Sequence, residues 1–143
     1  MPEIKALTLQ DPYGSLVAMG LKQYETRSWK TRYRGLLIIH VGKTLAINWK
    51  DRVFLSLLRD VGIPDPRKLP IGCAICICEL TAIYRTEDVM PHISDRELAF
   101  GDFSPGRAAW ELKNVQRFDK PIPCKGEQGL WNWQLKLPEG ITV

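Results

Sequence analysis

The sequence lacks any long apolar run. No stretch approaches the roughly 20 consecutive apolar residues that a bilayer-spanning helix needs, and the opening Met-Pro-Glu-Ile-Lys contains no apolar run of the signal-peptide kind. Internal repeats, low-complexity tracts and linkers long enough to separate domains are also missing. Because 143 residues with 45% apolar side chains suffice for one core, we expect a single domain over residues 1–143, soluble and cytoplasmic, with no membrane contact.

Histidine and cysteine are too few and too poorly spaced for a structural zinc site. Four cysteines and two histidines occur, namely Cys73, Cys76, Cys78, Cys124, His40 and His92. In an extended strand Cys76 and Cys78 share one face while Cys73 lies on the other, which is poor geometry for tetrahedral coordination. We therefore expect buried, reduced thiols, no bound metal and no cofactor.

Positive charge is concentrated near the start of the chain. The sequence holds 20 Lys and Arg against 16 Asp and Glu, a net charge of +4, and residues 1–59 hold ten of the cations but four of the acids. Cations and aromatic rings alternate within 22–34: Lys22, Arg27, Lys30, Arg32 and Arg34 with Tyr24, Trp29 and Tyr33. This mixture is typical of surfaces that bind nucleic acid or nucleotides. Arginine stems that cover apolar surface in a solvated loop produce the same pattern.

The N-terminal half predicts two helices and a buried strand. A short helix opens at Asp11-Pro12 and stops at Gly20. Residues 35–41 are apolar on both faces, as in a strand that is covered on both sides. Apolar residues at helical spacing predict a second helix over 47–61, with Thr44 as its cap.

The C-terminal half predicts mostly strands. Its expected elements are a strand over 71–84, a short helix around 87–91, a further turn near 95–99 and a loop. Strand segments over 108–112 and 115–118, which can bend at Lys113-Asn114, come next, followed by a loop from Pro121 and an alternating strand over 131–137 that buries Trp133. Several strands with two or three helices between them indicate an α+β fold. A strongly curled or closed sheet with helices on its flanks satisfies the pattern.

The segment Gly20-Leu-Lys-Gln-Tyr-Glu-Thr-Arg-Ser-Trp29 is the most informative for function. In an extended strand Glu25, Arg27 and Trp29 share one face. A carboxylate can pair with the polar edge of a planar ligand, a guanidinium can hold its phosphate, and an indole can stack on its ring. The alternatives are a local ion pair worth under about 1 kcal/mol and a tryptophan that covers the core.

Five segments in order resemble the ASCH domain family, a branch of the PUA-like superfamily, and in particular its small single-domain endothelial members. They are Gln10-Asp-Pro-Tyr-Gly-Ser-Leu-Val17, Gly20–Trp29, Arg34-Gly35 with Ile39-His-Val-Gly-Lys43, Gly106-Arg-Ala-Ala-Trp110, and Pro121-Ile-Pro-Cys-Lys-Gly-Glu-Gln-Gly-Leu-Trp131. The resemblance covers nearly the whole chain and implies a PUA-like β-barrel with flanking helices. It also implies a cleft formed by the G-x-K-x-x-E-x-R segment, with RNA or a modified nucleoside or nucleotide as the ligand.

One branch of this family removes the acyl group from N4-acetylcytidine, with the Lys and Thr of a G-x-K-x-x-T-x-R motif as catalytic residues. Gly20, Lys22 and Arg27 match that motif, but Glu25 stands at the Thr position. A carboxylate cannot replace a hydroxyl nucleophile, although it can act as a general base on water while Lys22 stabilises the oxyanion. For the second acid of that branch, Glu79 and Glu97 both remain open.

Seven residues are candidates for binding RNA or a nucleotide: Lys22, Glu25, Arg27, Trp29, Lys43, Arg107 and Trp131. Lys43 lies just past a buried strand, and Arg107 follows a Ser-Pro-Gly loop that can present N–H groups to phosphate. For Lys22, Lys43 and Arg107 the alternative is an ordinary surface charge. Glu79 interrupts an apolar strand and is either a catalytic acid or part of a structural ion pair. We expect His40 to be a hydrogen-bonded core residue.

Three functions are consistent with these residues. We favour a monomeric binding module for RNA or a modified nucleotide, whose affinity falls with salt because phosphate contacts release counterions. The alternative is an enzyme on the same cleft, either an amidohydrolase on N4-acylated cytidine or a ribonuclease, with Lys22 and Glu25 as catalytic residues. A protein-interaction module is the third, and no residue points to it directly.

Overall fold

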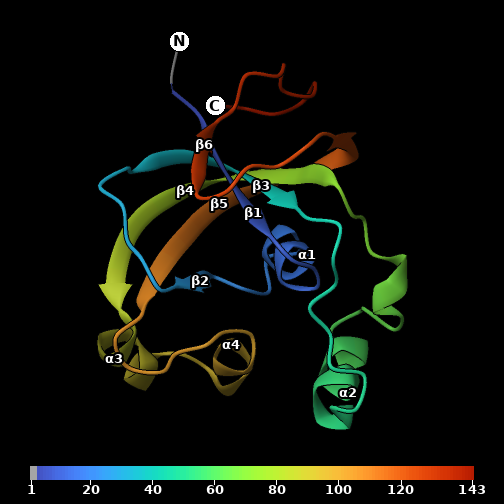
Figure 1. The fold of residues 1–143 in the computed structure, drawn as a ribbon, viewed down its shortest axis with the longest axis vertical. Helices are drawn as coiled ribbons and strands as arrows, with labels where there is room; N and C mark the ends of the chain where they lie inside the picture. Colours follow the sequence, from blue (N-terminus) through green and yellow to red (C-terminus); the bar gives the residue numbers. More distant parts are fainter. Residues whose placement is uncertain (1–2) are drawn as a thin grey trace.

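The computed structural model describes residues 3–143, in which one six-stranded sheet curls around a short helix (Figure 1). The sheet has the order β2-β5-β4-β3-β1-β6. Its strands are β1 (Lys5–Leu9), β2 (Tyr24–Arg27), β3 (Gly35–Val41), β4 (Cys73–Arg85), β5 (Ala108–Pro123) and β6 (Leu130–Asn132). The helices are α1 (Tyr13–Ala18), α2 (Arg52–Asp60), α3 (Thr86–Val89) and α4 (Asp95–Ala99), with single 3-10 turns η1 (Pro66–Lys68) and η2 (Met90–His92).

The curl of the sheet comes from its two longest strands. β4 and β5 pair antiparallel, and their register shifts three times, between Ala74 and Cys76, Ile77 and Glu79, and Leu80 and Ala82. Each extra residue bends the strand and increases its twist. Asn114 on β5 adopts a positive φ of 55° beside one of these shifts. The α+β architecture predicted from the sequence, a curled sheet with flanking helices, is confirmed.

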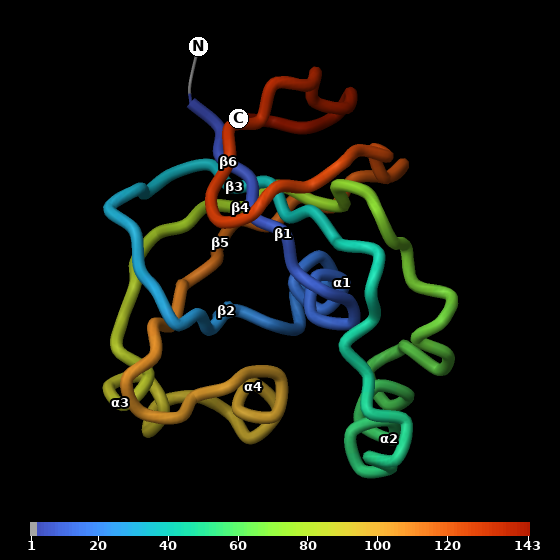
Figure 2. Tube along the Cα trace, in the orientation of Figure 1, coloured from blue at the N-terminus to red at the C-terminus, as the bar shows by residue number. Residues whose placement is uncertain are grey.

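Both faces of the central strands are buried. On one face Leu37 and Ile39 pack with Val17 of α1, and on the other Ile38 packs with Trp133 from the C-terminal segment. Figure 2 shows that α1 and the C-terminal segment lie on opposite sides of the sheet. Two covered faces explain why 35–41 and 73–78 have apolar runs without a polar alternation.

The edges of the curled sheet come close together at one seam. β2 is one edge strand, and β1 lies beside β6 at the other edge, so β1 and β2 share no strand pairing. The guanidinium of Arg27 on β2 nevertheless donates a hydrogen bond to the carbonyl of Thr8 on β1 at 2.7 Å. A side chain therefore bridges the gap that backbone pairing leaves open.

Several predicted boundaries are wrong. The second helix covers Arg52–Asp60 and not 47–61, because the carboxylate of Asp51, rather than Thr44, accepts from the Phe54 N–H and caps it. The strand expected over 131–137 ends at Asn132, although Trp133 is still buried as expected. Residues 108–123 form one strand, where two strand segments with a bend at Lys113-Asn114 and a following loop were expected.

Within residues 3–143, no helix has the length and apolar character that crossing a membrane requires.

Candidate functional site

The segment between α1 and β2 turns sharply into the curled sheet. After α1 the N–H of Leu21 donates to the carbonyl of Leu16 at 2.9 Å, and the N–H of Gly20 donates to that of Val17 at 3.0 Å. This is a Schellman motif, which needs the left-handed φ of +76° that Gly20 supplies. The turn directs the next side chain, Lys22, inward.

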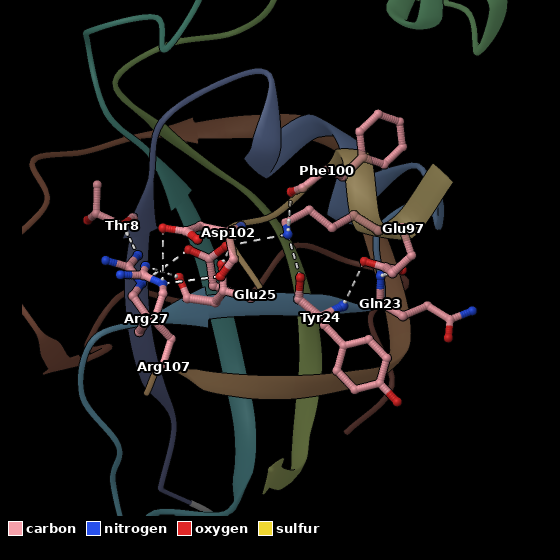
Figure 3. A network of polar contacts seen from close by, with 11 residues as sticks. Thr8, Gln23, Tyr24, Glu25, Arg27, Glu97, Phe100, Asp102 and Arg107 are labelled. Atoms are coloured by element: carbon pink, nitrogen blue, oxygen red, sulfur yellow. Dashed lines mark hydrogen bonds and ion pairs between the residues drawn. The ribbon is translucent and has the colours of Figure 1, made fainter. Parts of the chain in front are cut away.

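Lys22 is buried, with 1% of its surface exposed. Its ammonium donates to the carbonyls of Tyr24 and Phe100, the second at 2.8 Å, and lies 3.7 Å from a carboxylate oxygen of Glu25. Burial lowers the pKa of Lys22, while the charge of Glu25 opposes this shift. The alternative of an ordinary surface lysine is therefore wrong, since this charge is held by acceptors from two separate segments (Figure 3).

Glu25 lies between two cations. Its second oxygen is 3.1 Å from Nε of Arg27, and the Glu25 side chain is only 12% exposed. The two residues share a face of β2, as the strand pattern predicts. Arg27 is 25% exposed and bonds to Thr8 across the seam, so a charged series runs from Lys22 through Glu25 to Arg27 and β1.

A hollow of about 340 Å³ opens at this seam, and we call it the motif hollow. It is lined by Thr8, Leu9, Gln10, Tyr13, Glu25, Thr26, Arg27, Ser28, Trp29 and Arg107. Arg107 reaches it from the loop before β5, where its guanidinium donates to the carbonyls of Asp102 and Thr26 at 3.1 and 3.3 Å. Trp29 lines the hollow and also packs edge-on against the core residue Trp110, with ring centroids 4.8 Å apart.

A larger hollow of about 820 Å³ lies on the other side of Thr8, and we call it the lysine hollow. It is lined by Thr8, His40, Gly42, Lys43, Gly72, Cys124, Lys125, Gly126, Glu127 and Gln128.

Cys124 is only half-buried here, which corrects the expectation that all four thiols are buried, although none of the four forms a disulfide. His40 is buried and bonded through both ring nitrogens, as expected.

The seven candidates thus fall into separate groups. Glu25, Arg27, Trp29 and Arg107 line the motif hollow, and Lys22 lies beneath it without lining it. Lys43 lines the lysine hollow. Trp131 lines a third depression near β6, where its ring packs against His40 with centroids 5.9 Å apart.

A sequence profile identifies the family to which these features belong. The profile of the ASCH domain matches residues 7–122, which cover most of β1, the motif segment and most of β5. The chain belongs to the ASCH domain family. No narrower assignment follows from the profile alone.

Curated relatives of this ASCH domain are much longer proteins. It is 27% identical over 140 residues to activating signal cointegrator 1 of Mus musculus. It is 26% identical over 140 residues to activating signal cointegrator 1 of Homo sapiens. Each alignment covers 94% of this chain but only 23% of the relative.

Solved structures agree on the fold. The ASCH protein of Zymomonas mobilis superposes with a TM-score of 0.58, over 92% of this chain and 87% of that one, at 13% identity. A single-residue variant of the same protein superposes with a TM-score of 0.58, over 93% of this chain and 91% of that one, also at 13% identity. The α+β fold with a strongly curled six-stranded sheet and flanking helices is therefore confirmed, and the sheet is an open half-barrel because its edge strands do not pair.

The two open candidates for a second acid lie in different places. Glu97 of α4 is buried and accepts from the N–H groups of Gln23 and Tyr24 at 2.8 and 3.3 Å, so it holds the start of β2 beside Lys22. Glu79 is half-exposed and accepts from the side-chain amide of Asn114 at 3.1 Å. Its partner is therefore neutral, and among residues 3–143 no cation lies within 4.0 Å of its carboxylate, so the ion pair, one of the two alternatives for Glu79, is not formed.

Several residues of this ASCH domain were missed from the sequence. Thr8 lines both hollows, but the strand that carries it, β1, was not predicted. The alternation of Leu7 and Leu9 with Thr8 at strand spacing could have indicated this strand. Tyr13 was expected only as part of the first helix. Asp102 orients Arg107 from a loop, and no pattern in the sequence marks such a contact.

Proposed function

We propose that this ASCH domain binds RNA, or a modified nucleoside or nucleotide, in the motif hollow. The observation that carries the proposal is the convergence of Arg27 and Arg107, from elements far apart in sequence, on one polar hollow. Backbone carbonyls already orient both guanidiniums. A guanidinium has five N–H donors, so donors remain on each for a phosphate or a polar base edge.

The carboxylate of Glu25 supplies a hydrogen-bond acceptor that would recognise the polar edge of a base. Its carboxylate lines the hollow while Lys22 and Arg27 hold it from two sides. Carboxylates accept from the exocyclic amino group of cytosine, and adenine carries an amino group of the same kind. We therefore expect cytidine or adenosine to bind more tightly than uridine.

Aromatic side chains supply the remaining walls. Tyr13 and Trp29 line the hollow, and contact with Trp110 fixes the indole of Trp29. Stacking of a base on an aromatic ring contributes about 1–3 kcal/mol. The ring pair therefore favours a planar ligand over a simple anion.

The test is fluorescence polarisation with a labelled single-stranded cytidine-rich RNA at several salt concentrations. Losing hydrogen bonds to a charged group costs about 1.5–3 kcal/mol, so Arg27→Ala and Arg107→Ala should each weaken binding by roughly 10- to 150-fold. Both should also flatten the salt dependence. Arg59→Ala is the matched control, because Arg59 is exposed on α2 and lines neither hollow. Equal affinities for all four proteins would refute the proposal.

A hydrolase on the same hollow is the second candidate. The observation in its favour is that the Glu25 carboxylate lines the hollow with an ammonium 3.7 Å behind it, an arrangement suited to a general base. Lys22 would act there as a positioning residue, since its ammonium already donates to two carbonyls.

Incubation with N4-acetylcytidine and with single-stranded RNA, with and without divalent metal, tests this activity. Turnover that disappears in Glu25→Gln, a variant of nearly the same shape, would support it. Intact substrates under all of these conditions would exclude it.

A further inference from the structure

We infer that the lysine hollow is a second nucleotide subsite, so that the ASCH domain binds at least two linked nucleotides of single-stranded RNA across Thr8. This inference rests on the proposed function of the motif hollow. It concerns the larger of the two hollows, which that function does not use.

Two cations stand at the rim of the lysine hollow. Lys43 follows β3, and Lys125 follows β5. Both are exposed, and neither has an ion-pair partner within 4.0 Å among residues 3–143. Glu127 is the one acid in the lining. The stem of Lys43 lies along Gly72, where a side chain would come within 3.6 Å of it. These two ammonium groups therefore offer unneutralised charge to a phosphate.

The floor of the lysine hollow is a fixed imidazole. Nε2 of His40 lies 2.8 Å from the carbonyl of Cys124, and a carbonyl can only accept, so Nε2 carries the proton. Nδ1 lies 3.1 Å from the hydroxyl oxygen of Thr8 and forms the second hydrogen bond of the ring. Trp131 packs edge-on against the ring and completes its support. The ring is held on three sides and is only 2% exposed, so it fixes the floor and leaves the contacts with a nucleotide to the rim.

The loop that carries Lys125 packs directly on this floor. A Cβ on Gly126 would lie 2.5 Å from Oγ1 of Thr8 and 2.7 Å from the ring of His40. Glycine is therefore required for the loop that carries Lys125 to approach the floor. This contact fixes the backbone beside Lys125 relative to Thr8 and His40.

Thr8 is the junction between the two subsites, because it lines both hollows. Its carbonyl accepts from Arg27, and its hydroxyl bonds to His40. A phosphodiester that crosses Thr8 would have Arg27 on one side and the two lysines on the other. A mononucleotide can occupy only one of the hollows, whereas a dinucleotide can occupy both and gains from the linkage.

Calorimetric titration of the full chain with cytidine 5′-monophosphate and with the 5′-phosphorylated dinucleotide and trinucleotide of cytidine tests the inference. We expect the dinucleotide to bind the natural chain about tenfold or more tightly than the monophosphate. The ratio of these two dissociation constants should fall to about one in the double variant Lys43→Gln/Lys125→Gln. The double variant Lys120→Gln/Lys136→Gln changes charge equally, away from both hollows, and should keep the natural ratio.

The outcomes separate this inference from the proposed function. Monophosphate binding that is lost in Arg27→Ala, together with no gain from the second nucleotide, would overturn the second subsite and leave the motif hollow intact. If the double variant Lys43→Gln/Lys125→Gln still binds the dinucleotide more tightly than the monophosphate, the second subsite is overturned as well. Absence of binding by all three ligands would overturn the proposed function and this inference together.

Discussion

Replacing Lys22 by methionine should destabilise the fold more than any change at an exposed lysine. Methionine has a similar length but no ammonium. The change would leave the carbonyls of Tyr24 and Phe100 without their donor and would remove one of the two cations beside Glu25. All of these groups lie where water has little access, because Lys22 is 1% exposed.

The size of the effect follows from these contacts. Removing one partner of a buried ion pair costs about 3–5 kcal/mol, and we expect the lower end because Glu25 keeps Arg27 at 3.1 Å. A loss of about 3 kcal/mol is a large part of the roughly 5–15 kcal/mol that stabilises a folded domain. With a urea dependence of about 1–3 kcal/mol per molar, the unfolding midpoint should fall by about 1–3 M.

Urea unfolding followed by tryptophan fluorescence and by far-ultraviolet circular dichroism measures this loss. Lys30→Met is the matched control, because Lys30 is exposed in the same segment and should change the free energy of unfolding by no more than about 0.5 kcal/mol. A loss below about 1 kcal/mol in Lys22→Met would refute the structural role. The buried charge of Lys22 would then have to be explained by contact with a ligand in another conformation.

Three further predictions concern other buried groups. Burial raises the pKa of Asp11 above its ordinary value of 3.8, so the folded state holds this proton more tightly and the carboxyl lowers stability as the pH rises above about 3.8. Between about pH 4 and pH 7, the free energy of unfolding measured with urea should therefore fall less with rising pH in Asp11→Asn than in the natural chain. The same pH dependence in both proteins would contradict burial as the cause. Gly126→Ala should lower stability by about 1–3 kcal/mol, because the added methyl lies 2.5 Å from Oγ1 of Thr8, and an unchanged thermal midpoint would count against this packing. Burial raises the pKa of the Cys76 thiol to about 12, so a thiol reagent should label the half-buried Cys124 first, and equally fast labelling of both in the folded protein would be inconsistent with the structure.

The fold could be predicted where one local pattern dominates. The apolar run of 35–41 lies in β3, and the first part of the run of 71–84 lies in β4, because the stretches of these strands that are covered on both sides need apolar residues. The alternation over 131–137 was misleading. Trp133 is buried against the outer face of the sheet, but the chain leaves the edge after Asn132, so the same alternation serves packing without strand pairing.

The site could be predicted only in part. Strand periodicity correctly placed Glu25 and Arg27 side by side. It could not show that Lys22 points inward, since that depends on the turn at Gly20 and on the carbonyl of Phe100, 78 residues later in the chain. Lys43 has the right chemistry for the motif hollow but lies in the other hollow, because β1 separates the two.

The charged residues of the motif segment have a structural role that accounts for the position of the hollow. The sheet order leaves β1 and β2 without backbone pairing, and Arg27 bridges them through Thr8. The carboxylate of Glu25 pairs with Arg27 through one oxygen and with the buried Lys22 through the other. This pairing connects the bridge to the core. A hollow at such a seam has polar walls because the groups that close the seam are charged. It follows that Arg27→Ala should weaken both ligand binding and folding, whereas Arg107→Ala, which leaves the bridge intact, should weaken binding with a much smaller change in the unfolding midpoint.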